Sequence, residues 1–286
     1  MQLKPEWLKK SYRPSSEMKS VEDLISDLNL NTVCREASCP NYSECFNNGT
    51  ATIMILGANC TRNCAFCGVT NSAPEAIDSE EPHRVAEAAS RLNLDYVVIT
   101  SVTRDDLDDG GAGHFAEVIR KIRELSPKTK IEVLVPDFRG SLDAINVVID
   151  ARPDVISHNM ETVKNLYESV RPQADYEQSL ELIERVSKLG NGIHSKSGIM
   201  VGVGEKEDQV FKLFDDLRAV SCEFLTIGQY LSPSPQNIEV VEYITPETFE
   251  KWGNVAREKG FSFVASGPFV RSSYHAGEAL KKKEKD

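Results

Sequence analysis

The stretch TIMILGANCTRNCAFCG, residues 52–68, joins a short apolar run to three cysteines. The run at 52–57 is rich in Ile, Leu and Met and ends at a glycine, which predicts a buried strand. Cys60, Cys64 and Cys67 follow within a few residues, with three and then two residues between them. The stretch therefore predicts a strand with a group of thiols beyond its carboxyl end.

The run at 52–57 is the first of several along the 286-residue chain. The segments between the runs place apolar residues at i, i+3 and i+4, as expected for helices that pack on one face. This alternation predicts parallel strands with right-handed crossovers, covered by helices. We therefore predict an α/β fold, a partial (β/α)6 barrel of the TIM type that is open on one side; a doubly wound open sheet is the alternative. Further strands are expected at 95–102, 130–136, 154–159, 197–203 and 223–230, with a shorter one at 261–266.

Residues 1–50 precede the first predicted strand and contain no clear strand of their own. They are expected to form an extension that wraps on the barrel. Ser141 and Thr162 sit where helix N-caps are expected. The sequence shows no linker between independent domains. The predicted division is an N-terminal extension at 1–50, a barrel at 51–266 and a C-terminal segment at 267–286.

Charge and composition disfavour several classes of protein. The net charge of −11 at pH 7 disfavours nucleic-acid binding. The sequence has no apolar stretch long enough to span a membrane and no secretory signal, so a cytoplasmic protein is expected. Seven cysteines, an odd number, favour metal binding or catalysis over disulfides in that compartment. Cys222 stands apart from the others and is expected to be a buried core thiol.

Cys60, Cys64 and Cys67 offer three thiolates without an obvious fourth ligand. Structural zinc sites use four protein ligands, whereas three thiolates suit three irons of a [4Fe–4S] cluster and leave the fourth iron open for a small molecule. Loops after barrel strands form the reactive face of such folds. With Phe66 before its last cysteine, the motif resembles the signature of radical S-adenosylmethionine enzymes. The resemblance implies that the open iron binds S-adenosylmethionine and that a radical derived from it abstracts hydrogen from a C–H bond. A zinc or redox dithiol site is the alternative.

A second set of cysteines lies before the first strand. Cys34, Cys39 and Cys45 have four and then five residues between them, which does not place the thiols on one helical face. A loop-rich cradle that includes Pro40 is therefore expected. Two incomplete sets indicate two clusters; a single zinc or iron–sulfur module of six cysteines is the alternative.

The order C-x4-C-x5-C and then C-x3-C-x2-C resembles that of the lipoyl synthase family. Further segments along nearly the whole chain resemble motifs of this family. They are KPEWLKK (4–10), EASCPNYSECF (36–46), TSVTRDDLDDGGAGHF (100–115), SHNMETV (157–163), VRPQADYEQSL (170–180), KSGIMVGVGE (196–205), QYLSPS (229–234) and GPFVRSSYHAGE (267–278).

The resemblance implies that Cys34, Cys39 and Cys45 hold an auxiliary [4Fe–4S] cluster together with a serine of the R-S-S-Y motif. We assign this ligand to Ser273 and keep Ser272 as the second choice. A serine alkoxide matches iron less well than a thiolate, so it can leave when a cluster sulfide is alkylated.

The implied reaction inserts two sulfur atoms, at C6 and C8 of an octanoyl chain on a lysine of a lipoyl carrier domain, and the auxiliary cluster is the sulfur donor. The implied partners are the octanoylated carrier domain (H protein or an E2 subunit), a reductant such as flavodoxin or ferredoxin, and an iron–sulfur carrier for cluster repair. A sulfur-inserting enzyme similar to biotin synthase or a methylthiotransferase, and a non-catalytic iron–sulfur carrier, are the alternatives.

The resemblance also implies contacts with S-adenosylmethionine. Asn159, at the end of the strand at 154–159, and Glu161, just after it, are expected to contact its polar groups. Arg171 suits its carboxylate, because a guanidinium fork matches that group, and Gly202 is expected to allow close approach of the backbone to adenine. Other candidates are Gly204, Lys196 and Gln229, and the run Arg104, Asp105 and Asp106, which is expected either to order the cofactor or to cap a helix near His114.

Four residues depart from the family pattern. Arg35 stands where an acidic residue is common. Asn237, Glu239 and Glu242 replace a histidine, a proline and a basic residue. None of these is expected to contact a cluster ligand, but fewer basic residues weaken the attraction to an acidic lipoyl domain.

Overall fold

The computed structural model describes residues 4–10, 14–48 and 51–283. The chain divides into two compact units. The unit that we call the N-terminal unit contains Tyr12–Arg62 and Gly68–Ile156. The C-terminal unit contains Met1–Ser11, Asn63–Cys67 and Ser157–Asp286.

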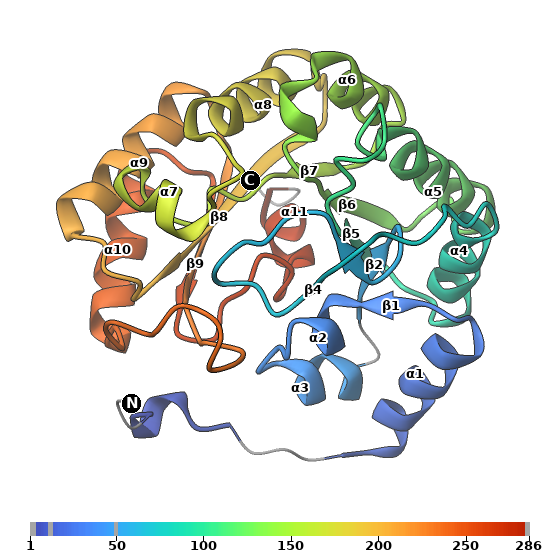
Figure 1. Ribbon diagram of the computed structural model, residues 1–286, viewed down its shortest axis with the longest axis horizontal. Coiled ribbons are helices and arrows are strands. Elements are labelled where there is room, and N and C mark those ends of the chain that lie inside the picture. Colours follow the sequence, from blue (N-terminus) through green and yellow to red (C-terminus); the bar gives the residue numbers. More distant parts are fainter. Residues whose placement is uncertain (1–3, 11–13, 49–50, 284–286) are drawn as a thin grey trace. The chain divides into compact units, whose positions relative to one another are not determined.

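Parallel strands form the centre of the N-terminal unit. β2 (Thr52–Ile55) pairs with β5 (Tyr96–Ser101), and β5 pairs with β6 (Lys130–Leu134). β-branched residues such as Ile53 and Ile99 lie opposite each other in this sheet and are buried, which suits a sheet covered on its faces. In Figure 1 the helices of this unit run along the outside of these strands. They are α4 (Glu81–Arg91), α5 (Ala112–Leu125) and α6 (Leu142–Asp150), with a 3-10 turn, η2 (Phe138–Gly140), before α6.

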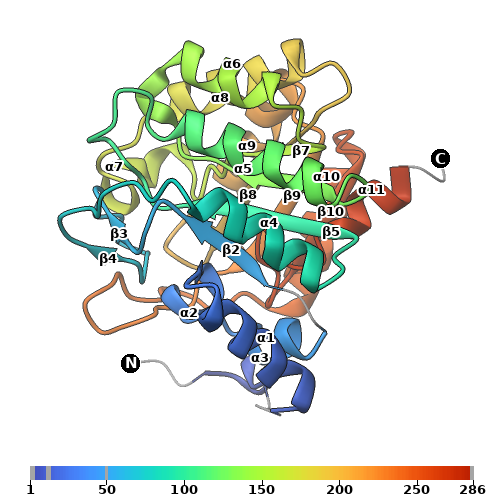
Figure 2. The same cartoon turned by 90° about the vertical axis from the view of Figure 1, so that its right-hand side faces the viewer.

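The segment before β2 is mostly helical. It contains α1 (Ser16–Asp27), α2 (Val33–Glu36) and α3 (Tyr42–Asn47), which Figure 2 shows gathered beside β2. It also contains a two-residue strand, β1 (Asn31–Thr32), which pairs antiparallel with β2. The expectation that residues 1–50 hold no strand was therefore wrong, because the exposed edge of β2 offers backbone groups that such a short polar segment can pair with. Beyond β2, β3 (Asn59–Cys60) and β4 (Thr70–Asn71) form a small separate ladder.

The C-terminal unit repeats the same pattern. β8 (His194–Val201) pairs in parallel with β9 (Phe224–Gln229), and β9 pairs in parallel with β10 (Phe263–Gly267). The short strand β7 (Val155–Ser157) spans the boundary between the units. The helical segments of this unit are η1 (Glu6–Leu8), η3 (Lys164–Leu166), α7 (Tyr167–Val170), α8 (Tyr176–Leu189), α9 (Glu207–Ala219), α10 (Pro246–Glu258) and α11 (Gly277–Lys283).

The helices of the C-terminal unit bury one face on the strands. Leu213 and Phe214 of α9, Leu225 of β9 and Phe249 of α10 belong to one buried apolar cluster. Burial of such side chains is the main term that holds helices on a sheet. Cys222 is fully buried in the same cluster, as expected for a core thiol.

All seven predicted strands are present as β2 and β5–β10. Ser141 caps α6 as expected, since its hydroxyl accepts a hydrogen bond from the amide of Ala144 at 3.2 Å. The N-cap expected at Thr162 was wrong, because the helical segment starts later and Val163 precedes η3.

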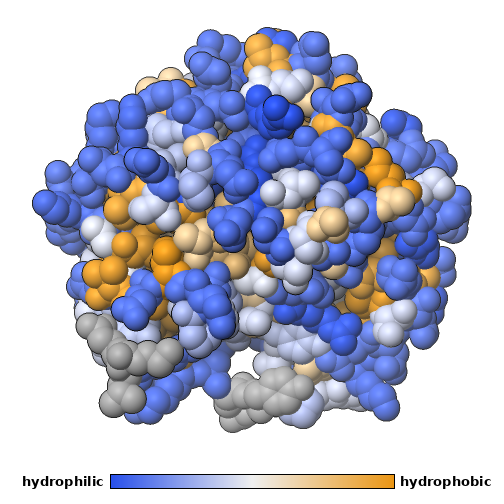
Figure 3. Space-filling model, in the orientation of Figure 1, coloured by the Kyte–Doolittle hydropathy of each residue, from blue (hydrophilic) through white to orange (hydrophobic). Residues whose placement is uncertain are grey.

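The face shown in Figure 3 is mostly hydrophilic, with hydrophobic residues in separate patches. Among the residues that the structure describes, no helix combines the length and apolar character needed to cross a membrane.

Candidate active site

Backbone amides surround the sulfur of Cys60, which lies at the end of β3. The amides of Thr103 and Arg62 donate hydrogen bonds to Sγ of Cys60 at 3.3 and 3.5 Å. Hydrogen bonds to the sulfur stabilise a thiolate and tune the potential of a cluster that it binds. This environment therefore suits a cluster ligand.

A buried arginine holds the loop that carries Cys60. Arg62 donates to Asp105 at 2.7 and 3.0 Å and to Asp137 at 2.7 Å through two nitrogens. Burial alone lowers the pKa of Arg62, but its hydrogen bonds to the two carboxylates outweigh this effect and raise the pKa above its ordinary value. Such a fork with two acids fixes the loop rigidly. Arg62 was not among the residues predicted from the sequence, although an arginine inside the cysteine spacing and an aspartate after β6 were signals of such a pair.

The other two cysteines of the motif belong to the C-terminal unit. Ala65, between them, donates its amide to the carbonyl of Val170 at 3.0 Å and accepts from the amide of Ile238 at 3.0 Å. Asn237 donates from Nδ2 to the carbonyl of Cys67 at 2.8 Å. The expectation that Asn237 does not contact a cluster ligand was therefore wrong. The loop after β9 folds back on the cysteine loop, which no local sequence pattern reveals.

The N-terminal cysteines lie on and between two short helices. Cys34 is in α2, Cys45 is in α3 and Cys39 lies in the loop that joins them. The expected loop-rich cradle is thus partly helical. Burial is the main cause that raises the pKa of the Cys34 thiol, to about 11, and a bound metal would overcome this cost by holding the sulfur as a thiolate.

The donor sets fit iron–sulfur clusters, although the structure does not assemble them. All seven cysteines are thiols, and three soft sulfur donors in each motif are the ligands that such clusters prefer. Within the described ranges, no three His, Cys, Asp or Glu side chains lie close enough together to form a metal site. The ligand sets therefore remain predictions from the sequence.

Three of the predicted cofactor-binding residues do come together. Nδ2 of Asn159 donates to Oε1 of Glu161 at 2.9 Å. Arg171 donates from one nitrogen to the carbonyls of Asn159 at 2.9 Å and Met160 at 3.3 Å. It also receives support from Tyr167, whose hydroxyl accepts from the same nitrogen at 2.9 Å. The guanidinium therefore orders the backbone on which Asn159 stands.

Glu161 is held in an unusual conformation. Its φ is 63°, a left-handed value that is rare for residues other than glycine. Its amide donates to Gly198 at 3.1 Å, and its carbonyl accepts from Met200 at 2.9 Å, so β8 imposes this conformation. Burial raises the pKa of its carboxyl group, although the charge of Arg171 opposes the shift. Strain and a perturbed acid at one position are typical of functional sites.

An unsatisfied amide oxygen lies beside this acid. Oδ1 of Asn159 is buried and has no hydrogen-bond partner among the described residues. Buried polar atoms are normally paired, so this oxygen is suited to accept a hydrogen bond from a ligand. Donor groups such as the amino and hydroxyl groups of S-adenosylmethionine match this need.

The backbone conformation and the close neighbours of Gly202 require a glycine at this position. It has a φ of 95°, and a Cβ there would lie 2.2 Å from Nε2 of Gln229 and 2.3 Å from the carbonyl oxygen of Glu242. Gln229 bonds the carbonyls of Val201, Tyr230 and Glu242 through this nitrogen. The contact of Gly202 with adenine stays a prediction. Gln229 ties the end of β8 to the segment at Glu242 through these hydrogen bonds.

Arg104, Asp105 and Asp106, which follow β5, form two separate ion pairs. Arg104 is buried, binds Asp106 through two nitrogens at 2.9 Å and donates to the carbonyl of Leu56 at 3.2 Å. Asp105 instead binds Arg62. The run thus fixes the loops after β2 and β5.

The R-S-S-Y segment lies against the same residues as the cofactor candidates. Ser272 Oγ accepts a hydrogen bond from Nδ2 of Asn159 at 2.6 Å, and the carbonyl of Ser272 accepts one from Lys196 at 2.6 Å. Within the described part of the chain, the hydroxyl of Ser273 forms no hydrogen bond. The hydroxyl of Ser272 is therefore already hydrogen-bonded, whereas the hydroxyl oxygen of Ser273 is available. This difference favours Ser273 as the predicted iron ligand.

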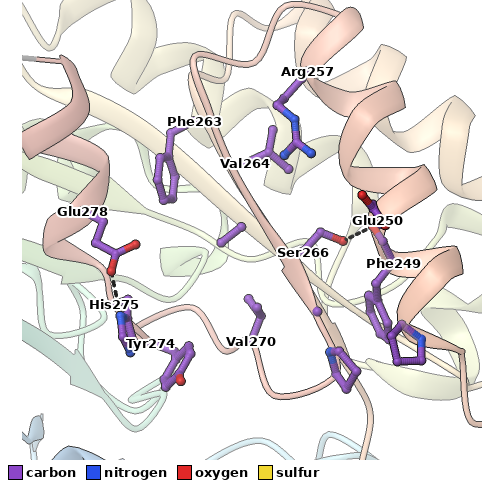
Figure 4. A pocket seen from close by; sticks show the side chains of 14 residues that line it. Phe249, Glu250, Arg257, Phe263, Val264, Ser266, Val270, Tyr274, His275 and Glu278 are labelled. Carbon is purple, nitrogen blue, oxygen red and sulfur yellow. Dashed lines mark hydrogen bonds and ion pairs between the residues drawn. The ribbon is translucent and has the colours of Figure 1, made fainter. Parts of the chain in front are cut away.

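A cavity of about 520 Å³ lies on another side of this segment. Figure 4 shows Tyr274 and His275 on one side and Phe249 and Glu250 on the other, with Val270 between them. The cavity separates the C-terminal segment from α10 at this point.

The chain matches known proteins along nearly its whole length. Residues 54–217 match the model of the radical SAM superfamily. The chain is 54% identical to a lipoyl synthase of Caldicellulosiruptor saccharolyticus over 97% of its own length and 98% of that protein. It is 51% identical to a lipoyl synthase of Alkaliphilus metalliredigens over 98% of its own length and 97% of that protein.

Solved structures share the fold at low sequence identity. Methylornithine synthase has a TM-score of 0.51 at 14% identity, and the match covers 86% of this chain and 81% of that chain. HydG, a maturase of the [FeFe]-hydrogenase, has a TM-score of 0.60 at 14% identity, and the match covers 93% of this chain and 66% of that chain. These likenesses confirm the predicted fold class, an α/β partial barrel. The matches in sequence show that the chain belongs to the lipoyl synthase family of the radical S-adenosylmethionine superfamily.

Proposed function

We propose that this chain inserts two sulfur atoms, at C6 and C8, into an octanoyl group on a lysine of a lipoyl carrier domain. Its family implies two [4Fe–4S] clusters and S-adenosylmethionine as cofactors. When bound, these groups supply hydrogen abstraction by an organic radical and the sulfur that is inserted.

One contact carries the proposal beyond family membership. Asn159, predicted to bind S-adenosylmethionine, donates a hydrogen bond to Ser272, the neighbour of the predicted auxiliary-cluster ligand, at 2.6 Å. The two residues are 113 positions apart in the sequence. The contact brings a predicted cofactor-binding residue next to the predicted auxiliary-cluster segment, which is what the proposed reaction requires.

The chain's own residues then take separate tasks. We assign Cys60, Cys64 and Cys67 to the cluster that binds S-adenosylmethionine. We assign the auxiliary cluster to Cys34, Cys39, Cys45 and Ser273.

Asn159 and Glu161 are proposed to orient the polar groups of the cofactor, since one offers a buried unpaired oxygen and the other a desolvated carboxyl group. Arg171 holds the carbonyls of Asn159 and Met160 and is proposed to meet the cofactor carboxylate as well. The predicted role of Gly202 is to let adenine approach the backbone.

The proposal includes three kinds of partner. The substrate is an octanoylated H protein or E2 domain. Flavodoxin or ferredoxin is proposed to supply electrons, and an iron–sulfur carrier to rebuild the auxiliary cluster. We propose a cytoplasmic location, and a division into an extension at 1–50, a barrel at 51–266 and a closing segment at 267–286.

Mass spectrometry of the product tests the reaction. The protein is reconstituted with iron and sulfide without oxygen, then incubated with dithionite, S-adenosylmethionine and an octanoylated carrier peptide. We expect a mass gain that equals two sulfurs minus two hydrogens. Cleavage of the cofactor without this gain would contradict the proposed reaction.

Cysteine variants separate the two clusters. Cys64→Ala is expected to abolish both cleavage of S-adenosylmethionine and sulfur insertion. Cys39→Ala is expected to abolish insertion and leave cleavage. Cys222→Ala is the matched control, because this thiol is buried in the core and should leave both reactions intact.

A further inference from the structure

Two polar side chains hold Ser272 from different parts of the C-terminal unit. Lys196 of β8 is 1% exposed and donates from Nζ to the backbone carbonyl of Ser272 at 2.6 Å. Asn159, after β7, donates to the hydroxyl of Ser272 at 2.6 Å. Hydrogen bonds from a charged donor are stronger than neutral ones, and Lys196 lies in a site with little access to water. The lysine is therefore the stronger of the two attachments.

Two glycines let the segment lie directly on the strands. A Cβ at Gly198 of β8 would lie 3.0 Å from the hydroxyl oxygen of Ser272 and 2.9 Å from Oδ1 of Asn159. A Cβ at Gly228 of β9 would lie 2.1 Å from the carbonyl oxygen of Val270. Real Cβ atoms do not approach so closely, so any other residue at Gly228 would displace the segment. The strands and the segment are thus complementary in shape at these two glycines.

On another side, the segment borders a cavity. Val270 and Tyr274 line the cavity shown in Figure 4. Packed interiors resist displacement, whereas a side chain that faces a void lacks contacts on that side. The contacts with β8 and β9 therefore help to decide where the segment lies.

The bond from Lys196 acts directly on the next residue. The carbonyl carbon and oxygen of Ser272 lie in one rigid peptide plane with the amide nitrogen and Cα of Ser273. A lysine that holds this oxygen therefore restricts where the Ser273 Cα can lie.

We propose that Lys196 is a positioning residue that presents the hydroxyl of Ser273 to the auxiliary cluster through this peptide plane. The inference rests on the proposed function, because it requires Ser273 to be an iron ligand. Lys196 itself touches neither the cluster nor the substrate in this proposal. It governs how firmly the serine-bound iron is held.

Release of iron from the auxiliary cluster tests the role without measuring turnover. Cys60, Cys64 and Cys67 are replaced by Ala in the full-length chain, so that only the auxiliary cluster forms. Lys196→Met keeps the length of the side chain and removes its donor. We expect iron to be lost to a chelator roughly tenfold faster, equivalent to about 1.4 kcal/mol. Lys188→Met is the matched control, since the Lys188 side chain is 66% exposed, and its rate should equal that of the parent.

A double-mutant cycle separates positioning from general stability. Once Ser273→Ala has removed the serine ligand, adding Lys196→Met should not accelerate iron release further. An equal acceleration in both backgrounds would show that Lys196 supports the fold in general and would overturn the inference. Equal rates for Lys196→Met and Lys188→Met would overturn it as well.

A second variant covers the case in which Lys196→Met does not fold, which circular dichroism of the apoprotein would show. Ser272→Ala removes only the bond from Asn159 and should also accelerate release, again only while Ser273 is present. If Ser272→Ala releases iron at the rate of the parent, the inference fails. If the parent with the three Ala replacements holds no cluster at all, the proposed function fails and the inference fails with it.

Discussion

Replacing Arg62 with methionine is expected to destabilise the N-terminal unit strongly. The side chains of Arg62 and Asp137 are 6% and 0% exposed, and their closest atoms are 2.7 Å apart. Removing one partner of a buried ion pair costs about 3–5 kcal/mol, because the other charge remains buried. Asp105 adds less, because its side chain is 26% exposed and water can solvate it.

The loss should depend on pH in a definite direction. In the variant, Asp137 keeps the bond from the amide of Arg139 at 3.0 Å but loses the guanidinium. Burial then favours its neutral form and places its folded-state pKa above the unfolded value of about 3.9. Below the unfolded pKa, Asp137 is neutral in both states and the stability penalty is small. The penalty grows as pH rises through the higher folded-state pKa.

Urea unfolding of the apoprotein, followed by circular dichroism at pH 7 and near pH 4, measures both effects. Arg91→Met is the matched control; the Arg91 side chain is 52% exposed, and its loss should stay within about 0.5 kcal/mol. Adding Asp137→Asn to Arg62→Met should recover part of the stability at pH 7. A loss below about 1 kcal/mol at pH 7, or the same loss at both pH values, would refute the reasoning from the buried pair.

Three further outcomes are expected. Gly202→Ala should lower the melting temperature more than Gly192→Ala. Both glycines have φ near 90°, and backbone strain costs about 1–3 kcal/mol at either position, but of the two only a Cβ at Gly202 would meet another atom within 4 Å. Equal losses in thermal denaturation would refute the contribution of this steric clash. Burial alone would raise the pKa of Glu223, but hydrogen bonds from His194 and Lys283 outweigh it and lower the pKa to about 2. The stabilisation from Glu223 should therefore be complete above its unfolded pKa of about 4.3 and disappear as pH falls toward 2, and acid unfolding of Glu223→Gln should lack this part of the pH dependence. In a chain that carries Ala at Cys34, Cys39 and Cys45, Asn237→Ala should release iron from the remaining cluster several-fold faster than the parent, because each lost hydrogen bond contributes about 0.5–1.5 kcal/mol; unchanged release would show that the bond to Cys67 does not steady the loop.

The strands and the candidate ligands were predictable from the sequence. Apolar runs such as 52–57 and 223–230 can be satisfied only by burial, and their regular alternation with amphipathic segments leaves few topologies. Cysteine spacing is equally informative, because three closely spaced cysteines typically indicate a metal site or a catalytic site. The short β1 strand escaped prediction, since two polar residues carry no periodic signal.

The contacts that connect the motifs were decided only by the tertiary structure. Arg62 meets Asp137 across 75 positions, Asn237 meets Cys67 across 170, and Asn159 meets Ser272 across 113. Local propensity and periodicity describe residues within a few turns of each other, whereas these partners become neighbours only when strands pair and the segments beyond them fold back. The sequence by itself determined which chemistry the chain carries. The preference for Ser273 over Ser272 as the predicted ligand, and the proposed role of Lys196, rest on which side chains the folded strands bring within hydrogen-bonding distance.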